Sequence, residues 1–170
     1  ARALVMETDL QAAIGAYAAS ARLDPRSIDT LREKGALERQ LGHHEQAAAT
    51  FRAWTEQHPD DAEAFHALAR AQLVLGLASD AVDASARAAR LAPDEEVYAL
   101  TWGRALHAAE RLREAAEVLE RVAYKALAAA ATHCELADVY RKLVRLDDSR
   151  RVLEAAEARW PAELIVYRTQ

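Results

Sequence analysis

Side-chain size recurs along the chain with a period of 34 residues, so that small and large apolar positions keep a fixed phase. Small residues return at Gly35, Ala69, Gly103 and Ala137, and again at Ala13, Ala47, Ala81, Ala115 and Ser149. Four residues after this second series stand Tyr17, Phe51, Leu119 and Leu153, interrupted by Ser85. Residues four apart share one face of a helix. A fixed period of this length indicates a stack of identical supersecondary units.

Prolines mark the ends of these units. Pro25, Pro59 and Pro93 are 34 residues apart, and Pro161 lies two periods beyond Pro93, with Leu127 at the skipped position. Proline lacks an amide hydrogen and restricts the residue before it, so it ends a helix. The polar residues that follow the prolines are expected to cap the next helix: Ser27, Asp60 or Asp61, and Asp94.

The composition also favours helices. The chain is 52% hydrophobic but only 6% aromatic, so alanine, the best helix former, supplies much of the apolar character. Alternating runs rich in Val and Ile are missing, which leaves strands little to build on. The pattern predicts helices over 2–7, 10–23, 28–41, 45–58, 62–75, 79–91, 96–109, 113–126, 130–143, 147–160 and 164–170.

Charge and cysteine content narrow the function classes. The net charge of −5, with acidic and basic residues interspersed, argues against a general nucleic-acid-binding protein. No apolar run is long enough to predict direct membrane insertion, and no signal peptide is visible. Cys134 is the only cysteine, which excludes a disulfide within the chain. Arginine far outnumbers lysine, which we associate with a GC-rich bacterial genome; both cytoplasm and periplasm fit.

Successive units carry matching sets of residues. The third has Phe65, Leu68, Ala69, Gly76, Ala81 and Pro93; the fourth has Trp102, Gly103, Leu106, Ala115 and Leu119; the fifth has Leu136, Ala137, Tyr140, Leu153 and Pro161. In these residues nearly the whole chain resembles the tetratricopeptide repeat family. A 35-residue RNA-reading helical repeat fits less well, because the spacing is 34 and a proline ends the unit.

The resemblance implies an all-α fold: a right-handed superhelical solenoid of antiparallel helix hairpins, with about four complete 34-residue repeats plus partial terminal repeats. We expect a single domain over 1–170. Its repeats are predicted at 1–27 (partial), 28–61, 62–95, 96–129, 130–163 and 164–170 (partial or a capping helix).

The resemblance also implies a binding groove, because the first helix of each hairpin lines the inner surface of such a stack. The groove residues expected on these helices are Arg32, Arg39, His66, Arg70, Leu73, Leu100, Arg104, His107, Asp138 and Arg141. We interpret them as a basic and apolar pocket for an acidic or amphipathic segment. In the alternative interpretation the inner face is solvated, and each arginine pairs with a neighbouring carboxylate.

Three features depart from the family pattern. Lys34 and Glu38 stand where the family has Leu and Tyr, and we expect them to pair on an exposed face. Leu127 replaces a proline, so the turn there is expected to be shorter or partly helical. The chain contains no Asn, and Ala36 occupies the place of the Asn in the two-carboxylate clamp that binds chaperone tails, which argues against that specialisation.

No catalytic, metal or cofactor site is predicted. The pair His43–His44 lies in a turn, the side chains of His133–Glu135 point in different directions, and His107 with Glu110 would need a second pair to hold a metal. We expect the imidazole of His133 to be packed and hydrogen-bonded. Glycine-rich phosphate loops and the motifs of serine hydrolases and zinc proteases are missing from the sequence. The chain is therefore not expected to be an enzyme.

These observations predict a non-catalytic scaffold that binds a protein or peptide segment in its groove. We expect it to be a fragment of a larger bacterial protein, and the resemblance implies a secretion, pilus or exopolysaccharide export assembly. Two alternatives stay open. One is a structural protein that self-associates end to end through its terminal repeats, and the other is a regulatory arm of a larger enzyme or membrane protein.

Overall fold

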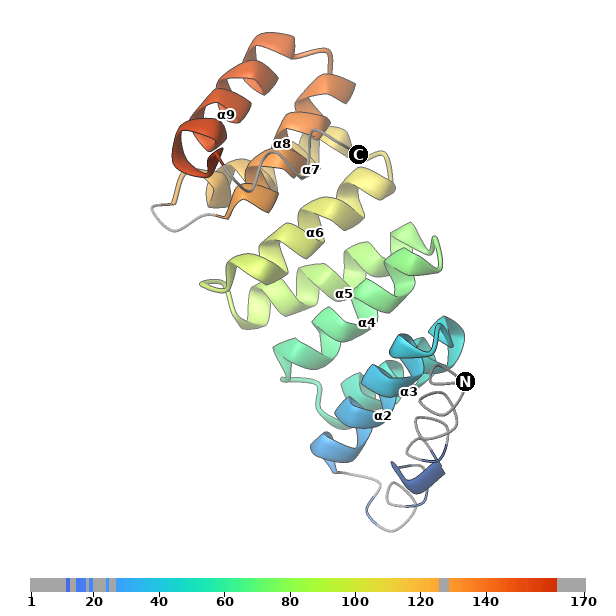
Figure 1. Ribbon diagram of the computed structural model, residues 1–170. Helices are drawn as coiled ribbons and strands as arrows, with labels where there is room; N and C mark the ends of the chain where they lie inside the picture. The colour runs from blue at the N-terminus through green and yellow to red at the C-terminus, as the bar shows by residue number, and fades with distance from the viewer. Residues whose placement is uncertain are drawn as a thin grey trace, which may run out of the picture. The chain divides into compact units, whose positions relative to one another are not determined.

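The computed structural model describes residues 12, 15–17, 19, 24, 27–125 and 129–161, and within these ranges it contains helices and turns but no strand. The helices pair along the chain as successive hairpins (Figure 1). They are α2 (Ile28–Gln40), α3 (His44–Gln57), α4 (Ala62–Val74), α5 (Ala78–Leu91), α6 (Glu96–Ala108), α7 (Leu112–Ala123), α8 (Ala130–Lys142) and α9 (Leu146–Arg159). The predicted all-α fold of repeated hairpins is confirmed.

Each of these helices begins and ends within three residues of its predicted position. The largest difference is at α7, which ends at Ala123 rather than at 126. The predicted helices over 2–7 and 164–170, most of the one over 10–23, and the turn around Leu127 lie outside the described residues.

The helices form two compact units, divided between Leu91 and Ala92. The first unit holds the hairpins α2–α3 and α4–α5, which fall within the predicted repeats 28–61 and 62–95. The second unit holds α6–α7 and α8–α9, within 96–129 and 130–163. The single domain over 1–170 stays a prediction.

Two of the three predicted caps are present. The side chain of Ser27 accepts a hydrogen bond from the Thr30 amide, and that of Asp61 accepts from the amides of Glu63 and Ala64. Each cap satisfies amide groups that the first turn of a helix leaves without a partner. The prediction for Asp94 was wrong, because Glu95 is the N-cap residue of α6 and its side chain makes no capping hydrogen bond.

Small residues let the two helices of a hairpin approach closely, as predicted. A Cβ atom at Gly103 would lie 2.5 Å from the Leu119 side chain, and one at Gly35 would overlap the ring of Phe51. Because only hydrogen occupies these positions, the large side chain of the second helix packs directly on the backbone of the first. Phe51 is 3% exposed and Leu119 is completely buried.

The expected pair of Lys34 and Glu38 forms, but the prediction that it lies on an exposed face was wrong. The Lys34 Nζ atom is 2.8 Å from Glu38 Oε1, and the Glu38 residue is only 4% exposed. The hydroxyl of Thr50 on α3 lies between them, 2.5 Å from Lys34 Nζ and 2.7 Å from Glu38 Oε2. A buried carboxylate needs such partners, because it loses its hydration.

Candidate functional site

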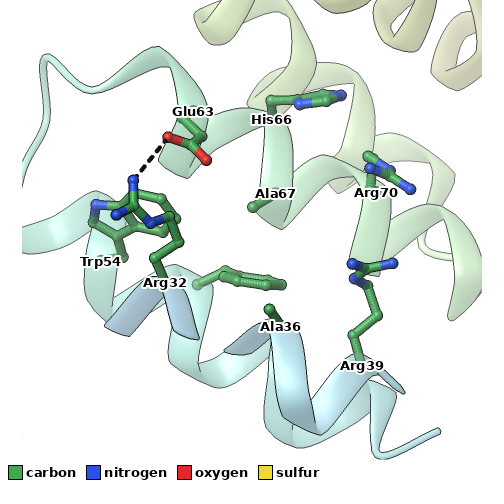
Figure 2. A pocket seen from close by; sticks show the side chains of 9 residues that line it. Arg32, Ala36, Arg39, Trp54, Glu63, His66, Ala67 and Arg70 are labelled. Atoms are coloured by element: carbon green, nitrogen blue, oxygen red, sulfur yellow. Dashed lines mark ion pairs between the residues drawn. The ribbon is translucent and has the colours of Figure 1, made fainter. Parts of the chain in front are cut away.

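A hollow opens on the first unit between α2, α3 and α4, with a volume of about 490 Å³ including its open mouth. Four of the residues predicted for the groove line it: Arg32 and Arg39 from α2, and His66 and Arg70 from α4. Figure 2 shows the side chains of Arg39 and Arg70 on the same side of this hollow. We call it the first hollow.

The floor of the first hollow is apolar. Ala36 on α2 and Ala67 on α4 are too short to cover the space between their helices. Phe51 and Trp54 reach it from α3, and both are buried, with ring centroids 6.3 Å apart. An apolar side chain entering the first hollow would therefore contact carbon atoms from three helices.

Positive charge dominates the rim. Three arginines line the first hollow, whereas Glu63 is its single carboxylate. Arg32 pairs with Asp29 one turn away on its own helix and lies 3.7 Å from Glu63. Because each guanidinium has several donors in a fixed fork, it can bind a further carboxylate in addition to these partners.

His66 contributes to the site as a neutral group. Burial, together with the charge of Arg70, lowers the pKa of the His66 imidazole from 6.5 to about 4. The ring is therefore uncharged near neutral pH, where it can donate one hydrogen bond and accept another.

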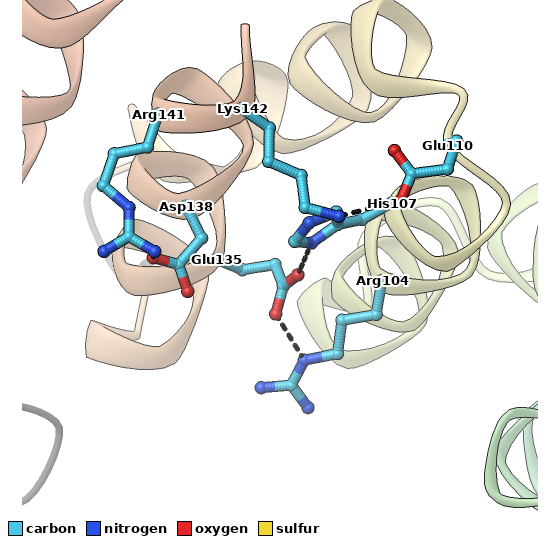
Figure 3. A network of polar contacts seen from close by, with 7 residues as sticks. All are labelled: Arg104, His107, Glu110, Glu135, Asp138, Arg141 and Lys142. Carbon is cyan, nitrogen blue, oxygen red and sulfur yellow. Dashed lines mark hydrogen bonds and ion pairs between the residues drawn. The ribbon is translucent and has the colours of Figure 1, made fainter. Parts of the chain in front are cut away.

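Four predicted groove residues of the second unit form ion pairs or hydrogen bonds within that unit. Glu135 on α8 lies 2.6 Å from His107 Nδ1 and accepts a hydrogen bond of 3.1 Å from Arg104 Nε, both on α6 (Figure 3). Asp138 and Arg141 form an exposed ion pair of 3.1 Å within α8. This face thus follows the alternative interpretation, in which arginines pair with neighbouring carboxylates.

The two apolar residues predicted for the groove do not line the first hollow. Leu73 is half-buried on α4, outside its lining. Leu100 is only 8% exposed, so it is a core residue rather than an accessible contact for a partner. Phe51 and Trp54, which provide the apolar surface that is present, were not predicted as site residues. The sequence feature that could have indicated them is the pair Ala36 and Ala67, whose short side chains leave the two rings uncovered.

The structure describes the surroundings of His133 and Cys134. His133 is buried, with Nδ1 3.2 Å from the Ala129 carbonyl oxygen, as predicted. Burial and the nearby carboxylates Asp138 and Glu135 raise the pKa of the Cys134 thiol, which disfavours the reactive thiolate.

Within 27–125 and 129–161 no three His, Cys, Asp or Glu residues gather closely enough to hold a metal ion. Nor does this part of the chain contain a helix long and apolar enough to cross a membrane.

Comparison with known proteins agrees with this architecture. Residues 28–71 match the family model described as tetratricopeptide repeat. A crystal structure of MamA superposes with a TM-score of 0.83 at 19% sequence identity, over 93% of this chain and 92% of the MamA chain. Among curated proteins, no sequence matches this chain.

Two further crystal structures have the same fold. YrrB, described as a TPR protein with an unusual peptide-binding site, gives a TM-score of 0.80 at 16% identity, over 99% of this chain and 87% of its own. TTC0263, a thermophilic TPR protein of Thermus thermophilus, gives 0.72 at 17% identity, over 98% and 91%. At these identities the likeness concerns the fold.

Proposed function

We propose that this chain, which matches the tetratricopeptide repeat family over residues 28–71 and has the fold of such proteins, is a non-catalytic scaffold for protein–protein interaction. Its first hollow holds an acidic or amphipathic segment of a partner protein. One observation carries the proposal: three arginines surround an apolar floor, and the first hollow contains a single carboxylate of its own. The peptide-binding site named for YrrB supports the same use of the fold.

The first hollow offers contacts for both the acidic and the apolar side chains of an amphipathic segment. Arg39 and Arg70 offer forked donors to a carboxylate, a geometry that lysine cannot reproduce. The floor formed by Ala36, Phe51 and Ala67 receives an apolar side chain next to that carboxylate. Burial of the apolar side chain supplies affinity, and the charges orient the segment.

A direct binding measurement tests this proposal. The probe is a fluorescein-labelled peptide of alternating Asp and Leu, and its counterpart has Lys in place of Asp. We expect fluorescence anisotropy to report binding of the acidic peptide only. The double variant Arg39→Glu with Arg70→Glu is expected to weaken binding at least about tenfold, because each reversed charge repels the peptide and removes a charge-assisted hydrogen bond. Arg104 is left unchanged, because it already pairs with Glu135.

The matched control changes the same charge at exposed arginines outside the first hollow, Arg90→Glu with Arg113→Glu. Circular dichroism checks that all variants keep their helical content. Equal binding of the acidic and basic peptides, or equal loss in both double variants, would discard the assignment of the first hollow.

The biological setting is a proposal from the resemblance alone. We propose a bacterial secretion, pilus or export assembly as the place where the scaffold works. Affinity capture with this chain, compared with the Arg39→Glu, Arg70→Glu variant, identifies partners that depend on the first hollow. Capture of proteins from other processes would count against this setting, while the peptide measurement tests the scaffold function separately.

A further inference from the structure

The first unit contains another hollow, lined by α3, α4 and α5, that shares no residue with the first hollow. We call it the second hollow; its volume is about 650 Å³ including open solvent. Arg52 comes from α3, Phe65 and Gln72 from α4, and Asp80 and Asp83 from α5. Apolar and acidic groups therefore meet over the middle of α4.

Polar groups of the second hollow lack partners within the described chain. Gln72 is only 4% exposed, yet its Oε1 atom accepts no hydrogen bond. Asp80 and Asp83 are exposed and make no ion pair with any other described residue. A buried amide oxygen without a donor is destabilising, because it loses its hydrogen bonds to water. A ligand that carries several N–H donors would satisfy all three groups.

The two repeats of the second unit have a donor at the equivalent position, whereas the α2–α3 hairpin has His43 and Gln46 there. An arginine precedes the second helix of each hairpin in the second unit, and it pairs with an acidic residue three positions later. Arg111 donates to Glu114 at 2.6 and 2.8 Å, and Arg145 donates to Asp148 at 2.7 Å. The equivalent of these acidic residues, 34 and 68 positions earlier, is Asp80. Leu77 stands three residues before Asp80, where the second unit has an arginine, and its side chain has no hydrogen-bond donor.

The surroundings of Arg145 match those of the second hollow in position, but one charge is reversed, because Arg52 stands where Arg145 has Glu120. The Arg145 guanidinium carbon lies 4.3 Å from the centre of the Tyr140 ring, and its Nη1 atom is 3.6 Å from Glu120 Oε1. The hydroxyl of Tyr140 donates to the same Glu120 oxygen at 2.5 Å. The three side chains around this guanidinium are Glu120, Tyr140 and Asp148, and their counterparts 68 residues earlier are Arg52, Gln72 and Asp80, all of which line the second hollow.

Stacked repeats place equivalent positions in equivalent local surroundings. By this correspondence the second hollow matches the surroundings of Arg145 in its own repeat, with Leu77 in place of the arginine and Arg52 in place of Glu120. We propose that the second hollow binds an arginine side chain of a partner protein. Asp80 and Asp83 bind its guanidinium fork, and Gln72, after rotation of its amide, directs Oε1 to a third N–H group.

Neighbouring residues define the segment that carries this arginine. Leu77 and Val74, at the adjoining turn, are 44% and 59% exposed, so they offer contact to an apolar residue beside the arginine. Arg52, the basic residue in the lining of the second hollow, favours an acidic residue in the same segment. The second hollow shares no residue with the first hollow. The side chain proposed to bind in it is basic, whereas the first hollow is proposed to bind an acidic segment.

An NMR titration tests the proposal. N-acetyl-arginine amide is added to the ¹⁵N-labelled chain, and the side-chain amide signals of Gln72 are followed. We expect a saturable shift of these signals, and a weaker one with N-acetyl-lysine amide, because an ammonium group cannot bind both carboxylates through a planar fork. Asp80→Asn with Asp83→Asn is expected to weaken the affinity about fivefold or more. Glu117→Gln with Glu154→Gln removes the same charge from the second unit as a control.

Leu77→Arg provides the sharpest variant, because it introduces at this turn the arginine found in both hairpins of the second unit. We expect its side chain to occupy the second hollow, to shift the Gln72 signals without added probe, and to block the probe. Unchanged binding in Leu77→Arg or in the double asparagine variant would overturn the proposal. Absence of a saturable shift of the Gln72 signals in the wild-type chain would also overturn the proposal. This holds even if Arg52→Ala restores binding, because the Arg52 side chain would then occupy the second hollow in the wild-type chain.

Discussion

The imidazole of His66 illustrates how a single residue adapts to the first hollow. It is half-buried beside Arg70, and both burial and this positive charge disfavour protonation, so its pKa falls to about 4. A charged histidine would repel the arginines of the rim, whereas the neutral ring adds hydrogen-bonding capacity without adding charge.

The lowered pKa leads to a prediction about pH. The unfolded chain, with a histidine pKa near 6.5, binds more protons than the folded chain between pH 6.5 and about 4. The contribution of neutral His66 to stability is therefore fully present above pH 6.5 and decreases as the pH falls to about 4. Native-state NMR titration of the imidazole protons is expected to give a midpoint near pH 4.

Arg70→Gln serves as the matched variant for this prediction. It removes the smaller of the two causes, so the pKa of His66 is expected to rise but to stay below 6.5, because burial persists. A native chain in which His66 titrates near 6.5 would contradict the prediction. An acidic peptide bound in the first hollow is expected to raise the same pKa, because a carboxylate stabilises the protonated ring.

At the scale of the helical hairpin, a buried polar cluster joins α2 to α3. Lys34 and Glu38 share the hydroxyl of Thr50, and Glu38 is almost completely buried. Removing the hydroxyl leaves the carboxylate with one partner fewer in a place that water reaches poorly. We expect Thr50→Val to lower the free energy of unfolding by about 1–3 kcal/mol.

Urea unfolding followed by circular dichroism measures this loss. Thr55→Val is the matched control, because Thr55 is similarly buried but donates only to a carbonyl oxygen of its own helix, Arg52 O. The triple variant Lys34→Leu, Glu38→Leu, Thr50→Val replaces the whole cluster by apolar groups and is expected to regain most of the stability. A Thr50→Val chain as stable as Thr55→Val would refute the role of the cluster.

The same cluster shows what the sequence could not predict. Helix ends follow from prolines, caps and residue size, which act within a few residues, and they were predicted to within three positions. Burial of Glu38 depends on Thr50, which another helix supplies. The period alone does not tell which polar side chains will meet across a hairpin.

At the scale of the whole chain, the predicted groove residues have different surroundings in the two units, and the reason is again contacts between helices. Helical phase placed Arg32, Arg39, His66 and Arg70 on one predicted groove, and all four line the first hollow. It gave equal weight to Arg104 and His107, because it cannot show that Glu135 of the following repeat binds both. The missed aromatic floor has the same origin, since α3 supplies it from outside the helices that were considered.

The division into two units predicts that strain in one unit has its main effect there. Gly35 and Gly103 occupy equivalent contacts, under Phe51 in the first unit and under Leu119 in the second. A methyl group at either position overpacks the hairpin at a cost of about 1–3 kcal/mol. The better helix propensity of alanine offsets roughly 0.5–1 kcal/mol of this cost.

Native-state hydrogen exchange distinguishes a local from a global effect. Each hairpin of a repeat fold contacts mainly its sequence neighbours, so local opening does not require unfolding of the whole stack. We expect Gly103→Ala to lower amide protection in α6 and α7 more than in α2 and α3, and Gly35→Ala to do the reverse. Phe51→Leu, combined with Gly35→Ala, should recover part of the protection, because the smaller side chain makes room for the methyl group. Equal loss of protection in both units would instead show that the chain unfolds as one cooperative body.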